Sequence, residues 1–433
     1  MNSIVELKKV VKYNTKRTLS NNISVENFVT TDNVLQNKAG ITLATNLPPQ
    51  GSTMPAFERN NILVANIRPY LKKIWFADRD GGCSADVLVF EVNKKFDPKY
   101  VYYSMFRDDF FDHVMRGSKG TKMPRGDKYQ ILEFQIPDIE LNEQQQIASF
   151  LSSLDSKISL NNRINTELEA MAKTMYDYWF VQFDFPNAEG KPYRSSGGKM
   201  VWSEELKREV PEGWEVGMIG DYCPSTGGFA FKSEWWTNEG VSVVKIKDIQ
   251  ENYTIDLNNL AKVDLTDKKV DEKFKVKAGD ILIAMTGATV GKYAIVPKTE
   301  YPIYVNQRVG FFNLGLEPTK RLPYLINSLN QSYFREAIFT LASGAAQPNI
   351  SNEQINNIQL IKPKYEIVNL YNFQWESAYK KILNNQQENQ HLSSLRDWLL
   401  PMLMNGQVKV NSGYEGEAAH LMAAEQEEKY GEK

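Results

Sequence analysis

The chain repeats itself at an offset of about 220 residues, and this repeat constrains the fold more than any other feature of the sequence. In the first half, Asn61-Ile-Leu-Val-Ala65 is followed by Lys72-Lys-Ile-Trp-Phe-Ala77. In the second half, Asp280-Ile-Leu-Ile-Ala284 is followed by Gly291-Lys-Tyr-Ala-Ile-Val296. Apolar runs separated by polar turn residues predict a strand, a turn and a second strand in each copy. Because the period is far longer than a solenoid repeat, we expect a duplicated two-part protein.

Each copy also carries a loop with glycine and proline that comes shortly before an isoleucine. The first loop is Gly117-Ser-Lys-Gly-Thr-Lys-Met-Pro124, ahead of Ile131. The second is Ser343-Gly-Ala-Ala-Gln-Pro348, ahead of Ile355. A long segment with helical periodicity follows each loop, so we expect each copy to end in a helix.

Both long segments have the alternating four-three spacing of a coiled-coil seam, with two asparagines at its middle. The first seam consists of Ile147, Leu151, Leu154, Ile158, Asn161, Asn165, Leu168, Ala172, Met175 and Trp179. The second consists of Tyr371, Trp375, Ala378, Ile382, Asn385, Asn389, Leu392, Arg396, Leu399 and Leu403. A buried amide is costly unless it meets another polar group, so we expect antiparallel pairing with the asparagine layers facing each other. The alternative is two unrelated amphipathic helices whose asparagines face solvent.

These patterns predict a mixed α+β fold with an internal pseudo-two-fold repeat. Two similar globular modules with small β-sheets and helices are separated by two long antiparallel coiled-coil helices. Between the copies, the density of Gly, Pro, Ser and Asn is that of a connector, and the acidic end of the chain is expected to be mobile. The predicted parts are a first module over 1–140, a central helix over 141–182, a linker and entry to the second module over 183–215, a second module over 216–365, a distal helix over 366–410 and an acidic tail over 411–433.

Composition narrows the classes of function. A net charge of -2 is not that of a protein that coats nucleic acid, so any DNA contact must use local basic patches. No apolar run approaches the roughly 20 residues that span a bilayer, and the first residues lack a signal-peptide pattern, so we expect a cytoplasmic protein without membrane contact. Cys83 and Cys223 form no CxxC pair, and His113, His391 and His420 are scattered, so we expect no disulfide and no metal site.

Several segments resemble the specificity subunits of Type I restriction-modification systems, and the resemblance covers nearly the whole chain. In the second module they are Asp280-Ile-Leu-Ile-Ala-Met-Thr-Gly-Ala-Thr-Val-Gly-Lys292, Val305-Asn-Gln-Arg-Val-Gly310 and Gly344-Ala-Ala-Gln-Pro-Asn-Ile-Ser351. In and around the central helix they are Glu143-Gln-Gln-Gln-Ile-Ala148, Leu154-Asp-Ser-Lys-Ile158, Asn161-Asn-Arg-Ile-Asn165 and Trp179-Phe-Val-Gln-Phe-Asp184. The stretch from Asn66 to Trp75 resembles one subclass of first recognition domains.

The resemblance implies that each module is a target-recognition domain that reads one half of a bipartite double-stranded DNA target. The paired helices would set the gap between the halves and dock two methyltransferase subunits. It implies no catalytic residue and no cofactor in this chain: S-adenosylmethionine would belong to the methyltransferase subunits, and ATP and Mg²⁺ to restriction subunits of the full complex. Because the first module has Asn66-Ile-Arg-Pro-Tyr70 where the second has the turn around Gly287, the two halves should read different bases.

The candidate DNA contacts are basic, amide and hydroxyl side chains in loops and turns, which can pair with base edges or phosphates. In the first module they are Arg68, Tyr70, Lys72, Lys73, Arg116, Lys119, Lys122, Arg125 and Lys128. In the second module they are Thr286, Thr289, Lys292, Gln307, Arg308, Gln347 and Asn349. The alternative for each of them is a structural role in its loop, or simple exposure to solvent.

Two other functions fit parts of the sequence. A structural coiled-coil adaptor without DNA binding agrees with the near-neutral net charge. A self-contained DNA-modifying enzyme would need a glycine-rich cofactor loop and a catalytic motif, which Asn66-Ile-Arg-Pro-Tyr70 only echoes. Gly287-Ala-Thr-Val-Gly-Lys-Tyr293 is one residue short of a nucleotide-binding P-loop and has Tyr in place of the Ser or Thr that binds Mg²⁺, so we interpret it as a turn between strands.

Overall fold

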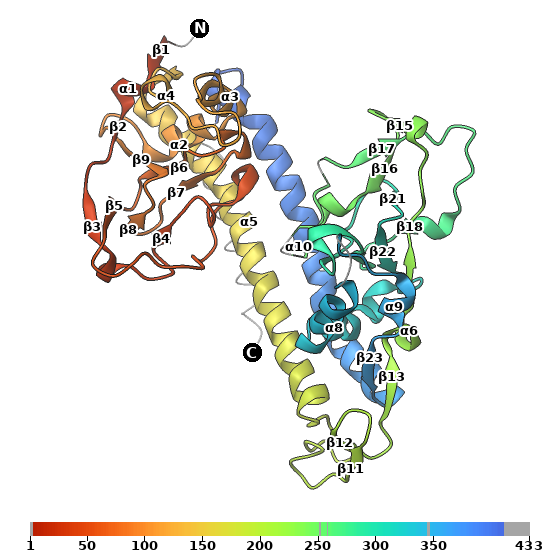
Figure 1. The fold of residues 1–433 in the computed structure, drawn as a ribbon. Helices are drawn as coiled ribbons and strands as arrows, with labels where there is room; N and C mark the ends of the chain where they lie inside the picture. The colour runs from red at the N-terminus through yellow and green to blue at the C-terminus, as the bar shows by residue number, and fades with distance from the viewer. Residues whose placement is uncertain (1–2, 251–252, 258, 344–346, 411–433) are drawn as a thin grey trace, which may run out of the picture. The chain divides into compact units, whose positions relative to one another are not determined.

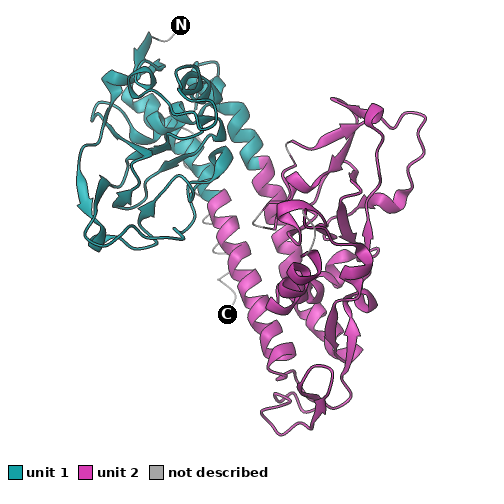
Figure 2. Ribbon diagram, in the orientation of Figure 1, with its two compact units in different colours: residues 1–157, 392–433 teal, residues 158–391 magenta. Residues whose placement is uncertain are grey.

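The computed structural model describes residues 3–250, 253–257, 259–343 and 347–410 (Figure 1). The chain forms two compact units, one from residues 1–157 and 392–433 and the other from 158–391 (Figure 2). Each unit contains one globular module together with a part of both long helices. The acidic tail predicted over 411–433 lies outside the described residues.

The first module is built on three small sheets. An antiparallel sheet has the order β2 (Val11–Tyr13), β9 (Val87–Val92), β6 (Ile62–Ala65), β7 (Ile74–Phe76). A second sheet has the order β3 (Arg17–Leu19), β5 (Thr53–Phe57), β8 (Gly81–Cys83), β4 (Phe28–Val29). A third pairs β1 (Ser3–Glu6) with β10 (Gln135–Asp138). The four side chains of β6 are all buried, which explains why this strand is an unbroken apolar run.

Short helices and both long helices complete the core of the first unit. The short helices are α1 (Leu7–Val10), α2 (Pro98–Phe106), α3 (Asp108–Arg116) and α4 (Lys128–Ile131). Asp97 caps α2 by accepting a hydrogen bond from the backbone N–H of Tyr100 at 2.9 Å. The long helices are α5 (Leu141–Tyr176) and α10 (Tyr365–Met404). Ile147 of α5 and Leu403 of α10 are buried in the same apolar core as α2 and α3.

The second unit repeats this plan. One antiparallel sheet has the order β14 (Ser225–Gly227), β22 (Val309–Phe312), β19 (Ile281–Ala284), β20 (Tyr293–Ile295). A five-stranded sheet has the order β15 (Trp236–Thr237), β17 (Ala261–Val263), β16 (Val241–Val244), β21 (Ile303–Val305), β18 (Lys275–Val276). A third sheet pairs β13 (Glu215–Met218) with β23 (Gln359–Lys362). The short helices are α6 (Ile219–Tyr222), α7 (Leu322–Leu329), α8 (Ser332–Ala342) and α9 (Asn352–Asn356).

The duplication extends to the register of the strands, which confirms the predicted internal repeat. The order β2-β9-β6-β7 of the first module corresponds to β14-β22-β19-β20 of the second. Ile62 lies opposite Phe76 in one copy, and Ile281 lies opposite Ile295 in the other. The predicted strand, turn and strand are therefore present in both copies.

The long helices pair antiparallel through their asparagine layers, as the seam predicts. Within the second unit, Asn385 Nδ2 donates to Asn165 Oδ1 at 2.8 Å, and Asn161 Nδ2 donates to Asn389 Oδ1 at 2.9 Å. Asn161 and Asn385 are each only 1% exposed, so the alternative in which these asparagines face solvent is wrong. No helix in the described part of the chain is long and apolar enough to cross a membrane.

Within the first unit, the seam holds a charge pair where Arg396 interrupts its apolar pattern. Arg396 Nη1 lies 2.7 Å from Asp155 Oδ1, and its guanidinium lies 4.6 Å from the centre of the Phe106 ring. The hydroxyl of Tyr103 donates to Asp155 Oδ2 at 2.6 Å. Arg396 also pairs with Asp397 at 2.9 Å, so two carboxylates neutralise this arginine, whose side chain is 12% exposed.

The segment over 183–215, predicted as a linker and entry to the second module, is more structured than a linker. It folds as a hairpin of β11 (Met200–Ser203) and β12 (Arg208–Pro211), preceded by a π-helical turn at Asp177–Val181. Phe183, Phe185 and Trp214 are buried, and the rings of Phe185 and Trp214 stack with their centroids 4.9 Å apart. The polar composition that suggested a connector belongs to the turns, whereas the aromatic residues anchor the segment in the core of the second unit.

Candidate nucleic-acid interface

In both modules a turn that follows a buried strand is bonded to the loop that precedes a short helix. In the first module, the N–H of Arg68 donates to the carbonyl of Pro124 at 2.8 Å, and the N–H of Gly126 donates to the carbonyl of Asn66 at 3.3 Å. Ile67 and Arg125 form an isolated β-bridge. The turn after β6 and the basic loop before α4, which the sequence predicted separately, therefore form one surface.

The second module has the same junction. The N–H of Gly287 donates to the carbonyl of Pro348 at 2.9 Å, and Thr286 forms a β-bridge with Asn349. The N–H of Met285 donates to the carbonyl of Arg308 at 3.1 Å, which adds the turn between β21 and β22. Three segments that are distant in the sequence thus meet at one edge. We call each of these junctions a reading edge.

The glycines of the second reading edge make a turn between strands and do not form a nucleotide-binding loop. Gly287 and Gly291 have φ values of 82° and 83°, in the left-handed region that favours glycine. The strands that they join, β19 and β20, are antiparallel neighbours. This agrees with our interpretation of the sequence around these glycines.

The first reading edge is cationic. Arg68 and all five predicted basic residues of the loop are exposed, the latter being Arg116, Lys119, Lys122, Arg125 and Lys128. Lys119 lies 3.3 Å from Asp127, with its own side chain 85% exposed, and Arg125 lies 3.1 Å from Asp86. Such solvent-exposed pairs are weak, so these cations remain accessible to phosphates.

Two of the predicted cations, Lys72 and Lys73, make contacts within the first module instead of facing solvent freely. Lys72 forms an ion pair with Asp108 at 3.0 Å. The ammonium of Lys73 donates to the carbonyl of Thr31, and burial lowers the pKa of Lys73. Both residues lie at the predicted turn, but their charges hold neighbouring segments of the module, so they are weaker candidates for DNA contact than Arg68.

The second reading edge carries mainly amides and hydroxyls. Gln307, Arg308, Gln347 and Asn349 are exposed. Thr286, Thr289 and Lys292 are half-buried in the turn that joins β19 to β20. Exposed amides can pair bidentately with adenine and an exposed arginine with guanine, so this edge offers more base-reading groups and less charge than the first.

Two exposed residues of the first reading edge were missed at the sequence level. Met123 is 51% exposed and Tyr129 is 84% exposed, whereas the predicted contact Tyr70 is 50% exposed. The signal that was available is their position in a loop that is otherwise glycine-rich and basic, where a large apolar side chain has no core to join.

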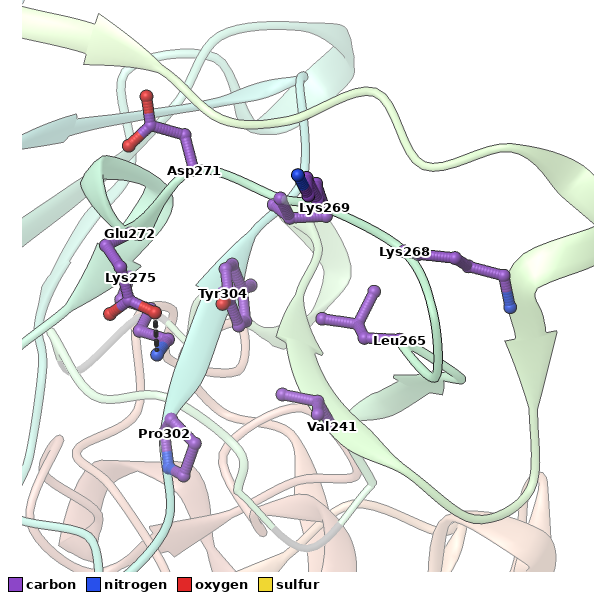
Figure 3. A pocket seen from close by; sticks show the side chains of 10 residues that line it. Val241, Leu265, Lys268, Lys269, Asp271, Glu272, Lys275, Pro302 and Tyr304 are labelled. Carbon is purple, nitrogen blue, oxygen red and sulfur yellow. Dashed lines mark hydrogen bonds and ion pairs between the residues drawn. The ribbon is translucent and has the colours of Figure 1, made fainter.

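A hollow of about 740 Å³ lies elsewhere on the second module (Figure 3). Its wall includes Lys268, Lys269 and Tyr304, and Figure 3 shows Lys275 paired with Glu272 beside them. Val241 and Pro302 also line it, at the starts of the parallel strands β16 and β21, whereas Gln307 and Arg308 follow the end of β21. The hollow is therefore distinct from the reading edge.

A smaller cavity of about 250 Å³ lies inside the second unit. Its wall contains Glu169 and Lys173 of α5, Arg335 of α8, and the phenols of Tyr253 and Tyr379. Burial raises the pKa of Glu169 to about 7. This carboxyl group therefore titrates near neutral pH within the folded unit.

The chemistry of the remaining reactive side chains is unremarkable. Both cysteines are buried, and burial raises the pKa of Cys83 to about 12 and that of Cys223 to about 11. Thiols of this kind are poor nucleophiles. Across the described residues, no cluster of three or more His, Cys, Asp or Glu side chains is placed to hold a metal ion.

Comparisons with known proteins find similarity over most of the chain. A family model described as the Type I restriction modification DNA specificity domain matches residues 4–170 and 211–390, which is one match for each copy of the repeat. The Type I restriction enzyme HindI specificity subunit of Haemophilus influenzae is 27% identical over 446 residues, covering 88% of this chain and 94% of that protein. The MjaIX specificity subunit of Methanocaldococcus jannaschii is 26% identical over 318 residues, covering 72% of this chain and 69% of that protein.

A solved structure is similar over the same length. The Type I restriction-modification system S subunit from M. genitalium aligns with a TM-score of 0.53 and 16% identity, covering 93% of this chain and 96% of that one. This likeness concerns the fold. Because the family model covers most of the sequence in two matched halves, the chain belongs to the family of Type I restriction modification DNA specificity domain proteins.

Proposed function

We propose that this chain selects the DNA sequence on which a Type I restriction-modification complex acts, with each module reading one half of a bipartite target. The observation that carries the proposal is the pair of reading edges. They occupy equivalent places in the repeated fold but present different side chains, as two readers of two different half-sites would.

The two reading edges carry side chains suited to different groups of the DNA. Exposed Arg68 and the basic loop of the first module suit phosphate contact and pairing with guanine. Gln307, Gln347 and Asn349 of the second module suit recognition of adenine. The small net charge of the chain fits this role, because affinity would come from two local surfaces and not from general attraction to DNA.

The helix pair supplies the spacer in this proposal. A helix of 36 residues such as α5 is about 54 Å long at 1.5 Å per residue. Its asparagine layers favour one register, since a slipped pairing would leave amides against Leu or Ile. We propose that this fixed register sets the gap between half-sites, and that the outer helix faces dock two methyltransferase subunits.

Catalysis would belong to the partners. The methyltransferase subunits would bind S-adenosylmethionine, and restriction subunits would use ATP and Mg²⁺. The two alternatives, a structural adaptor and a self-contained enzyme, are not favoured by the family to which the chain belongs.

The test is to express the chain with its methyltransferase partners in a host that lacks other DNA methylation and to sequence the methylome. A single bipartite motif is expected, with methylation lost when this chain is omitted. Methylation without the chain, or transfer of methyl groups by the chain alone, would contradict the proposal.

A further inference from the structure

The first reading edge ends in a closed hairpin tip. The N–H groups and carbonyls of Lys119 and Arg125 bond to each other reciprocally, both at 2.9 Å, and close a five-residue tip. Gly120 turns the chain with φ +99°. The N–H of Arg68 holds the carbonyl of Pro124, so the backbone beside Met123 is fixed before any ligand arrives.

The start of α4 is fixed as well. Asp127 caps the helix by accepting from the N–H of Tyr129 at 2.9 Å. The hydroxyl of Tyr13, on β2, donates to the carbonyl of Lys128 at 2.8 Å. Tyr129 therefore has an anchored backbone, while its side chain is 84% exposed.

The surroundings of these two side chains decide which partner they suit. From Arg116 to Lys128 the loop carries five cations and one carboxylate. That carboxylate, Asp127, is already engaged by two backbone N–H groups, which hold its pKa low. The cations of the loop suit the phosphates of duplex DNA, and the exposed apolar side chains of Met123 and Tyr129, whose backbones are fixed, suit its stacked bases.

We propose that Met123 and Tyr129 form an apolar wedge that unstacks a base step in the half-site read by the first module. This inference rests on the proposed function and specifies how one half of the target is recognised. Inserted apolar side chains kink DNA at flexible steps, so the first half-site would be selected partly by its deformability.

The second module supplies an internal contrast. At the offset of 224 residues that relates α4 to α9, Gln347 and Glu353 stand where the first module has Met123 and Tyr129. Glu353 is exposed, and a carboxylate would be repelled by phosphates rather than enter the stack. The distortion is therefore confined to the half-site of the first module.

The test uses the complex of this chain with its methyltransferase subunits and duplexes that contain its methylated motif. 2-Aminopurine replaces each purine of the first half-site in turn, except the adenine that is methylated, because a methyltransferase extrudes that base itself. We expect fluorescence at one step to rise several-fold on binding. The variant Met123→Ala/Tyr129→Ala should lose this rise and bind about 10-fold more weakly, since base stacking on one side chain contributes on this order.

Matched variants separate the wedge from general damage. Tyr129→Phe keeps the ring and should keep the signal, and Leu43→Ala/Tyr301→Ala removes exposed apolar groups elsewhere and should change neither fluorescence nor affinity. A saturated wild-type complex without a bright step would overturn the wedge but leave the proposed function standing. Release of methyltransferase subunits by the double variant would also overturn it, because the residues would then serve a protein interface. Failure of the wild-type complex to bind its motif would overturn both.

Discussion

Asn165 and Asn385 should contribute to the free energy of unfolding mainly as a pair, because they are hydrogen-bonded to each other. Asn385 is 1% exposed and donates to Asn165 Oδ1 at 2.8 Å. Asn385→Leu buries apolar surface but leaves the carbonyl of Asn165 without its donor, at a cost of about 1–3 kcal/mol. The gain in apolar burial offsets part of that cost, so we expect each single variant, Asn385→Leu or Asn165→Leu, to be destabilised by about 0.5–1.5 kcal/mol.

The double variant Asn165→Leu/Asn385→Leu removes both polar partners together. Its two leucines face each other in the seam, so we expect a free energy of unfolding equal to or above that of the wild type. The coupling energy in the double-mutant cycle should then be about 1–3 kcal/mol. Urea denaturation followed by tryptophan fluorescence gives the global values, and hydrogen exchange along α5 and α10 localises the effect. A coupling below about 0.3 kcal/mol would refute a paired asparagine layer, since sites that do not interact add within that margin.

The remaining predictions concern an ion pair, a buried carboxyl group, a phosphate contact and the length of the helices. Asp155→Asn removes the less exposed of the two carboxylates that pair with Arg396 and should destabilise the first unit by about 1–3 kcal/mol in thermal denaturation. Asp397→Asn removes the more exposed partner and should have a clearly smaller effect, so equal effects would contradict a pair that depends mainly on Asp155. Glu169 has a pKa of about 7 in the folded unit against 4.5 when unperturbed, so the free energy of unfolding should fall as pH rises between these values. Glu169→Gln should remove this pH dependence and raise the free energy of unfolding by about 1–3 kcal/mol at pH 8. An unchanged pH profile in the variant would show that the carboxyl group of Glu169 is solvated. Lys122→Ala should lower the slope of log affinity against log salt by about 1 without changing the methylated motif, and a changed motif would mean that Lys122 reads bases. Inserting seven residues into each long helix adds about 10 Å and should widen the gap between half-sites by about 3 base pairs in methylome sequencing, while an unaltered gap would contradict the spacer proposal.

The sequence predicts the repeat and the helix seam well because both depend on periodic burial. Ile62 and Ile281 lie in apolar runs whose offset matches the observed register. The pairing of the seam asparagines could be predicted because an amide buried in an apolar stripe is unfavourable unless it finds a hydrogen-bond partner. Local patterns of this kind carry enough information to specify an element and its buried face.

Other features depend on contacts between distant segments, which composition does not record. The segment over 183–215 resembles a linker in its polar residues, yet Phe185 and Trp214 stack inside the core. Lys73 resembles a DNA contact, yet its ammonium reaches the carbonyl of Thr31. Whether a given lysine serves the fold or a ligand is decided by such partners, so the candidate contacts could be predicted only as a set of loops.

Exchanging residues 216–365 for the second module of another family member shows whether the two modules read DNA separately. The methylome is sequenced in cells that express this chimera with its methyltransferase subunits. We expect one half of the methylated motif to change, while the other half and the gap stay as they were. A motif that changes in both halves, or in neither, would contradict separate reading by two modules.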